Sequence, residues 1–437
     1  MLQRELKKAL RSPLTWVVAA ICAVLTGHGF VLAIDLFSAG ARSVGAGTLL
    51  APQFEPLAGI VRPSLGGPYV ALSLLGPLVA CRAIAVDKER RTWASLILMR
   101  GSSLGVVASA TAASLAATLL PLLVLPALWV GWLAVGGHLA FAETAVALSG
   151  QVLYGGWLCL ISIAVSAWSR TWAQAAAVVL VAVMASWALD TSTGFAALAW
   201  LGPWEQLSVS AQLVPFERGA ASMGPALYFL SSGLGLFGAA WAGAALQLPF
   251  ARRVALAVVF LAASLGCAAA STSISRSVDL TEGARLSLPP AQAKAVGALP
   301  GPVQIEVEMD RDDARRTQLE NDFLFKLRLA RPDLQVRFPR DGQPDTGSAR
   351  DSYGQVRIHV GSQTSQTRGT SVEELTALVF EAAGQPLPDP SQAEYPGWPL
   401  VVEGPRRTAL MAWAYLLIPG ALAAVGMFSF RKQRRRT

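Results

Sequence analysis

Apolar residues are concentrated in eight runs, which shorter polar segments separate. A run of about 20 apolar residues is long enough to cross the hydrocarbon core of a bilayer as a helix. The pattern therefore predicts eight transmembrane helices, and Pro121 and Pro126 predict a break inside the third. The runs cover residues 14–37, 67–86, 104–135, 144–168, 172–189, 224–246, 254–270 and 408–430.

One long polar segment, residues 271–407, lies between the seventh and eighth runs. Residues 303–309 alternate apolar and polar side chains with the period of a strand. Two more strands, at 334–338 and 355–360, and helices at 312–331 and 371–383 follow from similar patterns, with Ser371 as an N-cap and a loop at 340–351. Strands alternating with helices predict a small α/β domain.

Composition agrees with a membrane protein, because 53% of the residues are apolar, only 15% are charged and the mean hydropathy is +0.46. These values exclude a disordered chain. The expected fold class is a mainly α-helical polytopic membrane protein with about eight transmembrane helices. One small extracytoplasmic α/β domain is expected between the last two spans.

The distribution of Lys and Arg predicts the topology. With the N-terminus inside, the short cytoplasmic segments carry seventeen of these residues, Arg82 included, and the opposite short loops carry three. Lys and Arg collect on the cytoplasmic side of membrane proteins. Both termini are therefore expected in the cytoplasm and residues 272–405 outside it. The net charge of +8 then reflects topology, and no nucleic-acid partner is expected.

Motifs for chemistry are missing from the sequence. No Gly-Lys pair occurs, so the chain has no P-loop for ATP. Residues 101–105 match G-x-S-x-G, but the expected context is the start of a transmembrane helix and not a nucleophile elbow. The histidines and cysteines lack metal-ligand spacing. We expect no catalytic, cofactor or metal site. His28, His138 and His359 are scattered along the chain, and Cys22, Cys81, Cys159 and Cys267 are interpreted as small buried hydrophobic residues.

Two cytoplasmic segments stand out as candidate docking elements. Residues 87–101 begin with a mixed-charge cluster and continue with apolar residues, and residues 1–11 have a similar character. Such segments dock into a groove of a soluble partner in one interpretation. In the other they carry topogenic charge and lie as interfacial helices. Residues 195–219 are a further interfacial candidate, with Trp200 and Trp204 as belt residues.

A resemblance to a known family favours the interpretation that these segments dock on a soluble partner. Glu89-Arg90-Arg91-Thr92 follows the second run and is similar to the Glu-Arg-Gly-Thr motif of type-2 ABC permeases. Arg91 replaces the usual Gly, and Ala94 replaces a usual acidic residue. The basic N-terminal helix and six spans also fit, as do Phe216-Glu217-Arg218-Gly219 and Leu227-Tyr228-Phe229. The likeness covers about residues 1–250.

The rest of the chain resembles the gliding-motility-type auxiliary component of ABC systems, in a shortened form. The resemblance rests on the order of motifs between the seventh and eighth spans. The motifs are Asp279-Leu280-Thr281, Leu286-Ser287-Leu288, Pro302-Val303-Gln304-Ile305 and Tyr353-Gly354-Gln355-Val356.

The two resemblances together imply a natural fusion. Its parts are a six-span permease with an interfacial N-terminal helix (1–250), a seventh span (251–271), an extracytoplasmic α/β auxiliary domain (272–405), and an eighth span with a basic cytoplasmic tail (406–437). The location implied is the bacterial cytoplasmic (inner) membrane.

The resemblance also implies partners. Two copies of a cytoplasmic ATPase would bind ATP and Mg²⁺ and dock on the chain, and the permease unit would form a homodimer. The coupling residues implied are Arg4, Glu5, Glu89, Arg90, Arg91 and Thr92. Membrane lipid and an extracytoplasmic protein complete the expected partners.

Two functions follow from these expectations. The chain is expected to be the transmembrane subunit of an export-type ABC transporter whose outer domain binds the substrate or an envelope partner. The alternative is a scaffold that transmits conformational work to an envelope machine, or to metalloprotein maturation, without moving a substrate. The chain itself is not expected to be an enzyme, because no acid, base and nucleophile converge.

Overall fold

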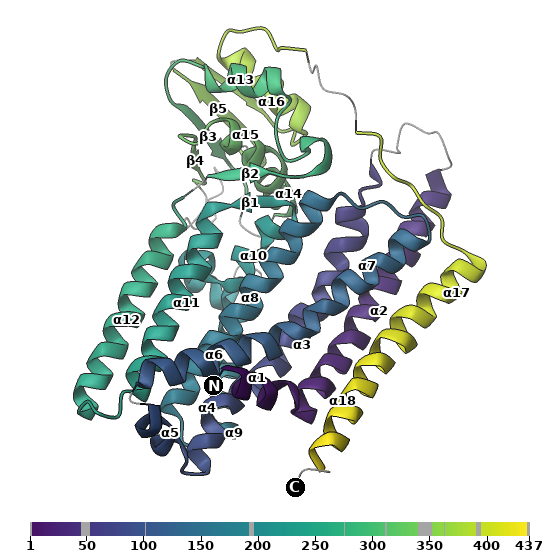
Figure 1. Cartoon of the computed structure of the whole chain (residues 1–437). Coiled ribbons are helices and arrows are strands. Elements are labelled where there is room, and N and C mark those ends of the chain that lie inside the picture. Colours follow the sequence, from purple (N-terminus) through teal and green to yellow (C-terminus); the bar gives the residue numbers. More distant parts are fainter. Residues whose placement is uncertain are drawn as a thin grey trace.

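The computed structural model of the chain describes residues 2–44, 53–100, 102–191, 196–274, 276–310, 313–339, 352–361, 363–389 and 395–434. The expected loop at 340–351 lies outside these residues, as do Gly101 and the last three residues of the basic tail. Within the described part, the molecule is a helical bundle with a small α/β domain at one end (Figure 1). Both chain termini lie at the other end, which we call the terminal end.

Eight helical segments are long and apolar enough to cross a membrane, in agreement with the eight predicted runs. The helices that build them are α2 (Pro13–Val44), α3 (Arg62–Ala80) with α4 (Arg82–Glu89), α6 (Ser103–Leu119) with α7 (Val124–Ala134), α8 (Phe141–Trp168), α9 (Trp172–Asp190), α11 (Met223–Ala244), α12 (Phe250–Ser271), and α17 (Gly404–Ala412) with α18 (Ile418–Arg434). These helices form the membrane part of the fold.

Shorter helices cover both ends of the bundle. At the terminal end, α1 (Leu2–Leu10) precedes the first span and α5 (Trp93–Arg100) follows α4. A 3₁₀ helix (Ala196–Leu207) and α10 (Val209–Glu217) occupy the predicted interfacial stretch 195–219. Trp200 and Trp204 are exposed there, as side chains of an aromatic belt would be.

The second span starts ten residues earlier than predicted. A π-helical turn (Leu57–Val61) leads directly into α3, whereas the sequence reading took Arg62 and Pro63 as part of a loop. Pro63 lies in the first turn of α3, where its missing N–H is not needed. The third span breaks as expected, with a 3₁₀ turn (Leu120–Leu123) at Pro121 between α6 and α7.

The α/β domain contains a four-stranded sheet in the order β4-β3-β5-β6. The strands are β3 (Val303–Val307), β4 (Gln335–Arg337), β5 (Val356–Val360) and β6 (Gln363–Thr367). The β3–β4 pair is parallel, and the β3–β5 and β5–β6 pairs are antiparallel. The three strands predicted from alternation are confirmed, whereas polar β6, with the sequence QTSQT, was not expected.

Helices cover one face of this sheet and close its core. The chain runs from β3 through α14 (Ala314–Leu319), a π-helical turn (Glu320–Leu324) and α15 (Phe325–Ala330) to β4. Leu319, Phe323 and Leu327 are buried as their spacing predicted. α16 (Val372–Ala382) begins after Ser371, whose hydroxyl accepts a hydrogen bond from the Glu374 N–H at 3.3 Å. α13 (Pro290–Gly297) was not predicted.

A short two-stranded ribbon connects the domain to the bundle. β1 (Ala220–Ser222) precedes α11, and β2 (Ser277–Asp279) follows α12. The strands pair antiparallel, with Ser222 opposite Ser277, and the two hydroxyl oxygens lie 2.7 Å apart. Since α11 and α12 also pack against each other, the ribbon extends that helix pair into the domain (Figure 1).

Candidate functional site

The ends of α4 and α5 form the first candidate site, and a tight turn joins them at the predicted coupling motif. The Thr92 N–H donates to the Asp87 carbonyl at 2.9 Å, and the Arg91 N–H donates to the Lys88 carbonyl at 3.0 Å. This pair of bonds defines a Schellman cap. The residue of the cap that must be left-handed is Arg91, with φ of +57°.

Arg91 therefore stands where a helix cap favours glycine. The Schellman hydrogen bonds around Arg91 hold this unfavourable backbone conformation.

Glu89 has a structural contact as well as an exposed position. Its carboxylate accepts a hydrogen bond from the Trp172 backbone N–H at 2.5 Å, at the first turn of α9. A carboxylate at a helix N-terminus is favoured by the free N–H groups there. Glu89 thus ties the end of α4 to the start of α9, while Arg90 and Thr92 are exposed beside it.

Lys88 fixes the same turn to a third helix. Its ammonium donates to the carbonyls of Ser166, Ala167 and Ser169 at 3.2, 2.9 and 2.5 Å. These carbonyls belong to the last turn of α8 and the residue after it, where a cation is stabilising. The sequence reading did not single out Lys88, although a lysine just after a long apolar run is typical of such a cap.

α5 presents one buried and one exposed side. Trp93 and Ile97, four residues apart, are buried against α6 and α8. Leu98 and Met99 at its tip are 81% and 84% exposed. Exposed apolar side chains beside a charged turn are typical of a binding surface.

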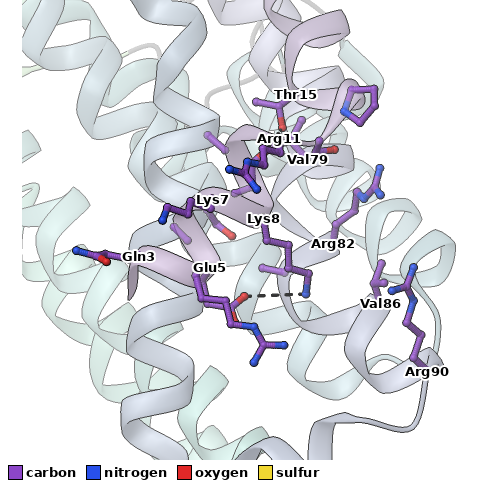
Figure 2. A pocket seen from close by; sticks show the side chains of 18 residues that line it. Gln3, Glu5, Lys7, Lys8, Arg11, Thr15, Val79, Arg82, Val86 and Arg90 are labelled. Atoms are coloured by element: carbon purple, nitrogen blue, oxygen red, sulfur yellow. Dashed lines mark hydrogen bonds and ion pairs between the residues drawn. The ribbon is translucent and has the colours of Figure 1, made fainter. Parts of the chain in front are cut away.

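α1 reaches the same region from the N-terminus. It packs against α6, and the Lys8 ammonium lies 2.8 Å from the Asp87 carboxylate of α4. Glu5 is buried on α1 with 7% exposure, 4.0 Å from Lys8. Arg4, Glu5 and Arg90 line one common cavity between these helices (Figure 2). The fold therefore brings the two predicted coupling segments together.

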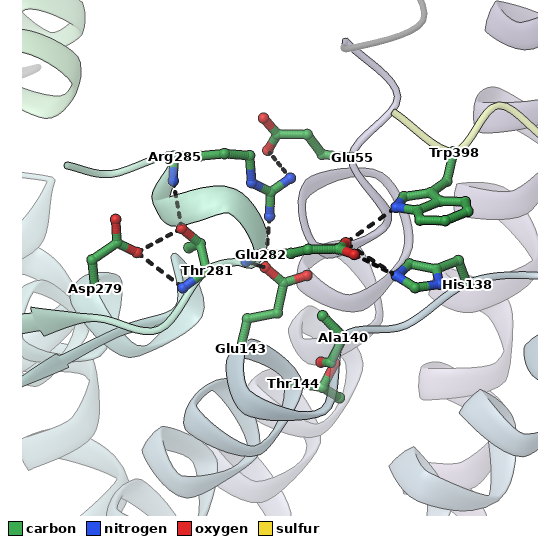
Figure 3. Close-up of polar contacts among 10 residues, drawn as sticks. All are labelled: Glu55, His138, Ala140, Glu143, Thr144, Asp279, Thr281, Glu282, Arg285 and Trp398. Atoms are coloured by element: carbon green, nitrogen blue, oxygen red, sulfur yellow. Dashed lines mark hydrogen bonds and ion pairs between the residues drawn. The ribbon is translucent and has the colours of Figure 1, made fainter. Parts of the chain in front are cut away.

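A second polar cluster lies at the domain end, where the sequence reading placed only boundary residues. Arg285, in the turn after β2, lies 2.6 Å from Glu143 of α8 and 3.2 Å from Glu55 (Figure 3). Glu143 also accepts a hydrogen bond from the Glu282 N–H at 3.0 Å. The Arg285 guanidinium packs over the Tyr395 ring at 4.5 Å. One buried arginine thus connects the domain entry, α8 and the start of the second span.

His138 belongs to the edge of this cluster. Its Nε2 lies 3.0 Å from both carboxylate oxygens of Glu282, and its ring stacks on Trp398 at 3.9 Å. The Trp398 indole N–H donates to Glu282 at 3.1 Å. Glu282 lies in the segment that enters the domain after the seventh span, and Trp398 lies in the segment that leaves it before the eighth span. Glu282 therefore links the two segments that connect the domain to the bundle (Figure 3).

Two of the motifs that carry the auxiliary resemblance, those at residues 279–281 and 286–288, meet at this junction. Asp279 accepts from the Thr281 N–H at 2.9 Å and from the Ser287 hydroxyl at 2.8 Å. The Leu280 N–H donates to the Gly219 carbonyl at 3.1 Å, so the Phe216–Gly219 motif is adjacent as well. A Cβ on Gly219, whose φ is +85°, would lie 2.8 Å from the Thr281 methyl group. Only glycine fits this contact.

A cavity of about 340 Å³ lies next to the junction, with a mixed-charge lining. Burial raises the pKa of Glu55 and of Glu217 above its ordinary value and lowers the pKa of Arg218. The charged residues of its wall are Glu55, Arg62, Glu217, Arg218, Arg285, Asp322 and Lys326.

The other residues considered for chemistry lie apart from one another. Cys22, Cys81 and Cys159 are buried as predicted, whereas Cys267 is exposed on α12, so that part of the prediction is wrong. Ser102 caps α6, its hydroxyl accepting from the Gly105 N–H at 3.2 Å. His28 contacts Tyr415 at 2.9 Å, and His359 contacts Thr364 at 2.8 Å. Among the described residues, no group of three or more His, Cys, Asp and Glu side chains could hold a metal ion. No family model, curated protein or solved structure matches this chain.

Proposed function

We propose that the chain is the transmembrane subunit of an export-type ABC transporter complex, a type-2 permease fused to an auxiliary domain. A separate ATPase, two copies per complex, would bind ATP and Mg²⁺ at the terminal end, which would face the cytoplasm. The permease unit would act as a homodimer in a bacterial inner membrane. The α/β domain would then lie outside the cytoplasm and receive the substrate or an envelope partner.

The observation that carries this proposal is the meeting of α1 with the α4–α5 turn. Both segments have a similar charged and apolar character in the sequence, and Lys8 of α1 contacts Asp87 of α4. Leu98 and Met99 add an exposed apolar tip. A charged turn with an apolar tip is a suitable surface for a soluble partner.

The contacts of the turn also supply a route for coupling. Lys88 contacts the end of α8, Glu89 contacts the start of α9, and α4 follows α3 after a single residue. A force applied to α5 would therefore act on three spans at once. Rigid elements joined by such polar contacts are the physical basis of coupling between distant sites.

A second function rests on the junction at the domain end. Arg285 and Glu282 connect the domain to α8, to the second span and to the approach of the eighth span. Motion of the bundle would be passed to the domain through these contacts. This arrangement suits a scaffold that performs conformational work on an envelope partner without moving a substrate.

Charge-removing variants of the turn test the coupling role. E89Q keeps an oxygen that can accept from Trp172, and R91Q removes the positive charge but keeps a polar, unbranched side chain. We expect both to lower ATPase activity stimulated by the chain, with unchanged expression and thermal unfolding. R252Q, at an exposed position of the same end, is the matched control. Equal stimulated activity in all three variants would rule out the coupling assignment.

Reconstitution separates the two functions. Vesicles holding the chain and its ATPase partner should accumulate or release an envelope substrate in an ATP-dependent manner if the chain is a transporter. Strong ATPase stimulation by an outer protein, with no flux of any candidate substrate, would favour the scaffold.

A further inference from the structure

A cavity of about 680 Å³ lies between α1, α4 and α6 at the terminal end (Figure 2). Its wall is strongly basic and contains a single carboxylate, that of Glu5. The six cations of the lining are Arg4, Lys7, Lys8, Arg11, Arg82 and Arg90.

The positive charge of this cavity is largely uncompensated. Lys8 is engaged by Asp87 at 2.8 Å. The other five cations have no carboxylate within ion-pair distance in the described part of the chain. Like charges held together in one wall repel, and the repulsion is relieved by a bound anion.

The spacing of the basic residues along α1 also indicates uncompensated positive charge. Arg4 and Lys8 are four residues apart, as are Lys7 and Arg11, so each pair lies on one face of the helix. Like charges at this spacing destabilise a helix. A nine-residue helix is only marginally stable by itself. An anion placed beside these basic residues would therefore stabilise α1.

Part of the cavity lining is apolar. It is made by aliphatic side chains of α3, α4 and α6, chiefly Val79, Ala83, Val86, Ala113 and Ala117. The chain turns at Ser12 and Pro13 from amphipathic α1 into the first span. The cavity thus offers both cations and aliphatic surface at the point of the chain where a span begins.

We propose that this cavity binds an anionic glycerophospholipid, with the phosphate among the cations and the glycerol and first acyl carbons on the aliphatic wall. The cations come from two regions: Lys7 lies on α1 and Arg11 directly after it, and Arg82 lies on α4 and Arg90 directly after it. One bound headgroup lies between both sets, lowers their mutual repulsion and ties the N-terminal helix to the helix that leads into the α4–α5 turn. The inference does not depend on the ATPase.

Thermal unfolding of the full chain in a zwitterionic detergent, titrated with phosphatidylglycerol, tests the site. The lipid should raise the unfolding midpoint saturably, and phosphatidylcholine should not. Inorganic phosphate at equal concentration should have little effect, because it lacks the part that contacts the aliphatic wall. An equal shift with phosphate would show an anion site without lipid character and overturn the proposal.

Double variants that remove two charges show whether phosphatidylglycerol binds at this cavity. R11Q/R82Q should weaken phosphatidylglycerol binding about 25-fold, at about fivefold for each charge near a membrane surface. R170Q/R252Q removes the same charge from exposed positions of the same end and should bind as the native chain does. R11K/R82K keeps the charge and should also retain binding, which separates charge loss from misfolding. Equal weakening in R11Q/R82Q and R170Q/R252Q would contradict the site.

Discussion

Arg91 has a left-handed backbone although it is not glycine, and the turn around it carries the proposed coupling motif. The Schellman hydrogen bonds of Thr92 and Arg91 hold this conformation. A non-glycine residue there costs about 1–3 kcal/mol, which the surrounding structure must offset. Neither the Schellman turn nor the strain at Arg91 was predicted from the sequence, and both are visible only in the backbone.

Replacing Arg91 with glycine should stabilise the chain. R91G relieves the left-handed strain, and the gain exceeds the extra entropy of glycine in the unfolded chain by about 0.5–1 kcal/mol. R90G is the matched control, since Arg90 has φ of −78° and gains nothing from glycine. Thermal unfolding in detergent should place R91G above the native chain and R90G below it. If R91G unfolds at a lower temperature than the native chain and R90G at a higher one, Arg91 is not the left-handed residue of the helix cap.

The carboxyl of Glu217 should make stability depend on pH. Burial raises its folded-state pKa above the ordinary value of 4.5, so the stability that the neutral carboxyl contributes is complete below pH 4.5. It is lost as the pH rises through the folded pKa. E217Q, which stays neutral, should unfold at a higher temperature than the native chain at pH 8.

The advantage of E217Q should vanish at pH 4, where the native carboxyl is also protonated. E373Q removes a carboxylate from an exposed position of α16 and controls for net charge. An advantage of E217Q that is the same at pH 4 and pH 8 would show that burial of the charge is not its cause.

At the scale of elements, the apolar runs were sufficient to predict the eight spans and the alternation to predict three strands. β6 could not be predicted, because its QTSQT sequence has no apolar face, and its place is set by pairing with β5 and by contacts with α16. The start of the second span was predicted wrongly. Proline usually ends a helix, and the sequence does not show that Pro63 lies in the first turn of α3, where proline is tolerated.

The packing of α2 on α3 depends on one glycine. A Cβ on Gly67 would lie 2.5 Å from the Thr26 Cα and 2.7 Å from its backbone nitrogen, so the two helices would have to separate. Gly66, the preceding residue, has open space around its Cβ position. The apolar pattern does not show which of these two adjacent glycines faces α2, and only the packing distinguishes them.

Alanine at the two glycines should therefore have opposite effects. G67A should destabilise the chain by about 1–3 kcal/mol through overpacking. G66A should be neutral or stabilise it by up to about 1 kcal/mol through helix propensity. The difference in unfolding free energy between the two variants measures the contact. Similar values for both would mean that α2 and α3 do not meet at Gly67.

At the scale of the whole molecule, the junction of domain and bundle depends on residues far apart in the sequence. Glu143 lies in the first turn of α8, and its side chain is 2% exposed and pairs with Arg285. Nothing in the local pattern around either residue indicates the partner, 142 positions away. The coupling segments differ in this respect, because their sequence alone marked them as unusual.

Removing Arg285 should have a large effect on stability. R285A leaves the buried Glu143 without its cation and should cost about 3–5 kcal/mol. R42A breaks an exposed pair with Glu403, whose side chains are 56% and 58% exposed, and should cost about 0–1 kcal/mol. Thermal unfolding of both variants checks the ranking. Equal losses would show that the Arg285 cluster does not hold the junction.

The docking of an ATPase on the α4–α5 tip is the central claim, and one purification tests it most directly. The tagged native chain, L98E/M99E and L387E are isolated in mild detergent, and the recovered proteins are identified by mass spectrometry. Leu387 is an exposed apolar residue in the α/β domain and serves as the matched control. We predict that an ATPase with a P-loop accompanies the native chain and L387E but not L98E/M99E. Absence of any such ATPase from the native chain at good yield, or its equal recovery with all three, would contradict the account.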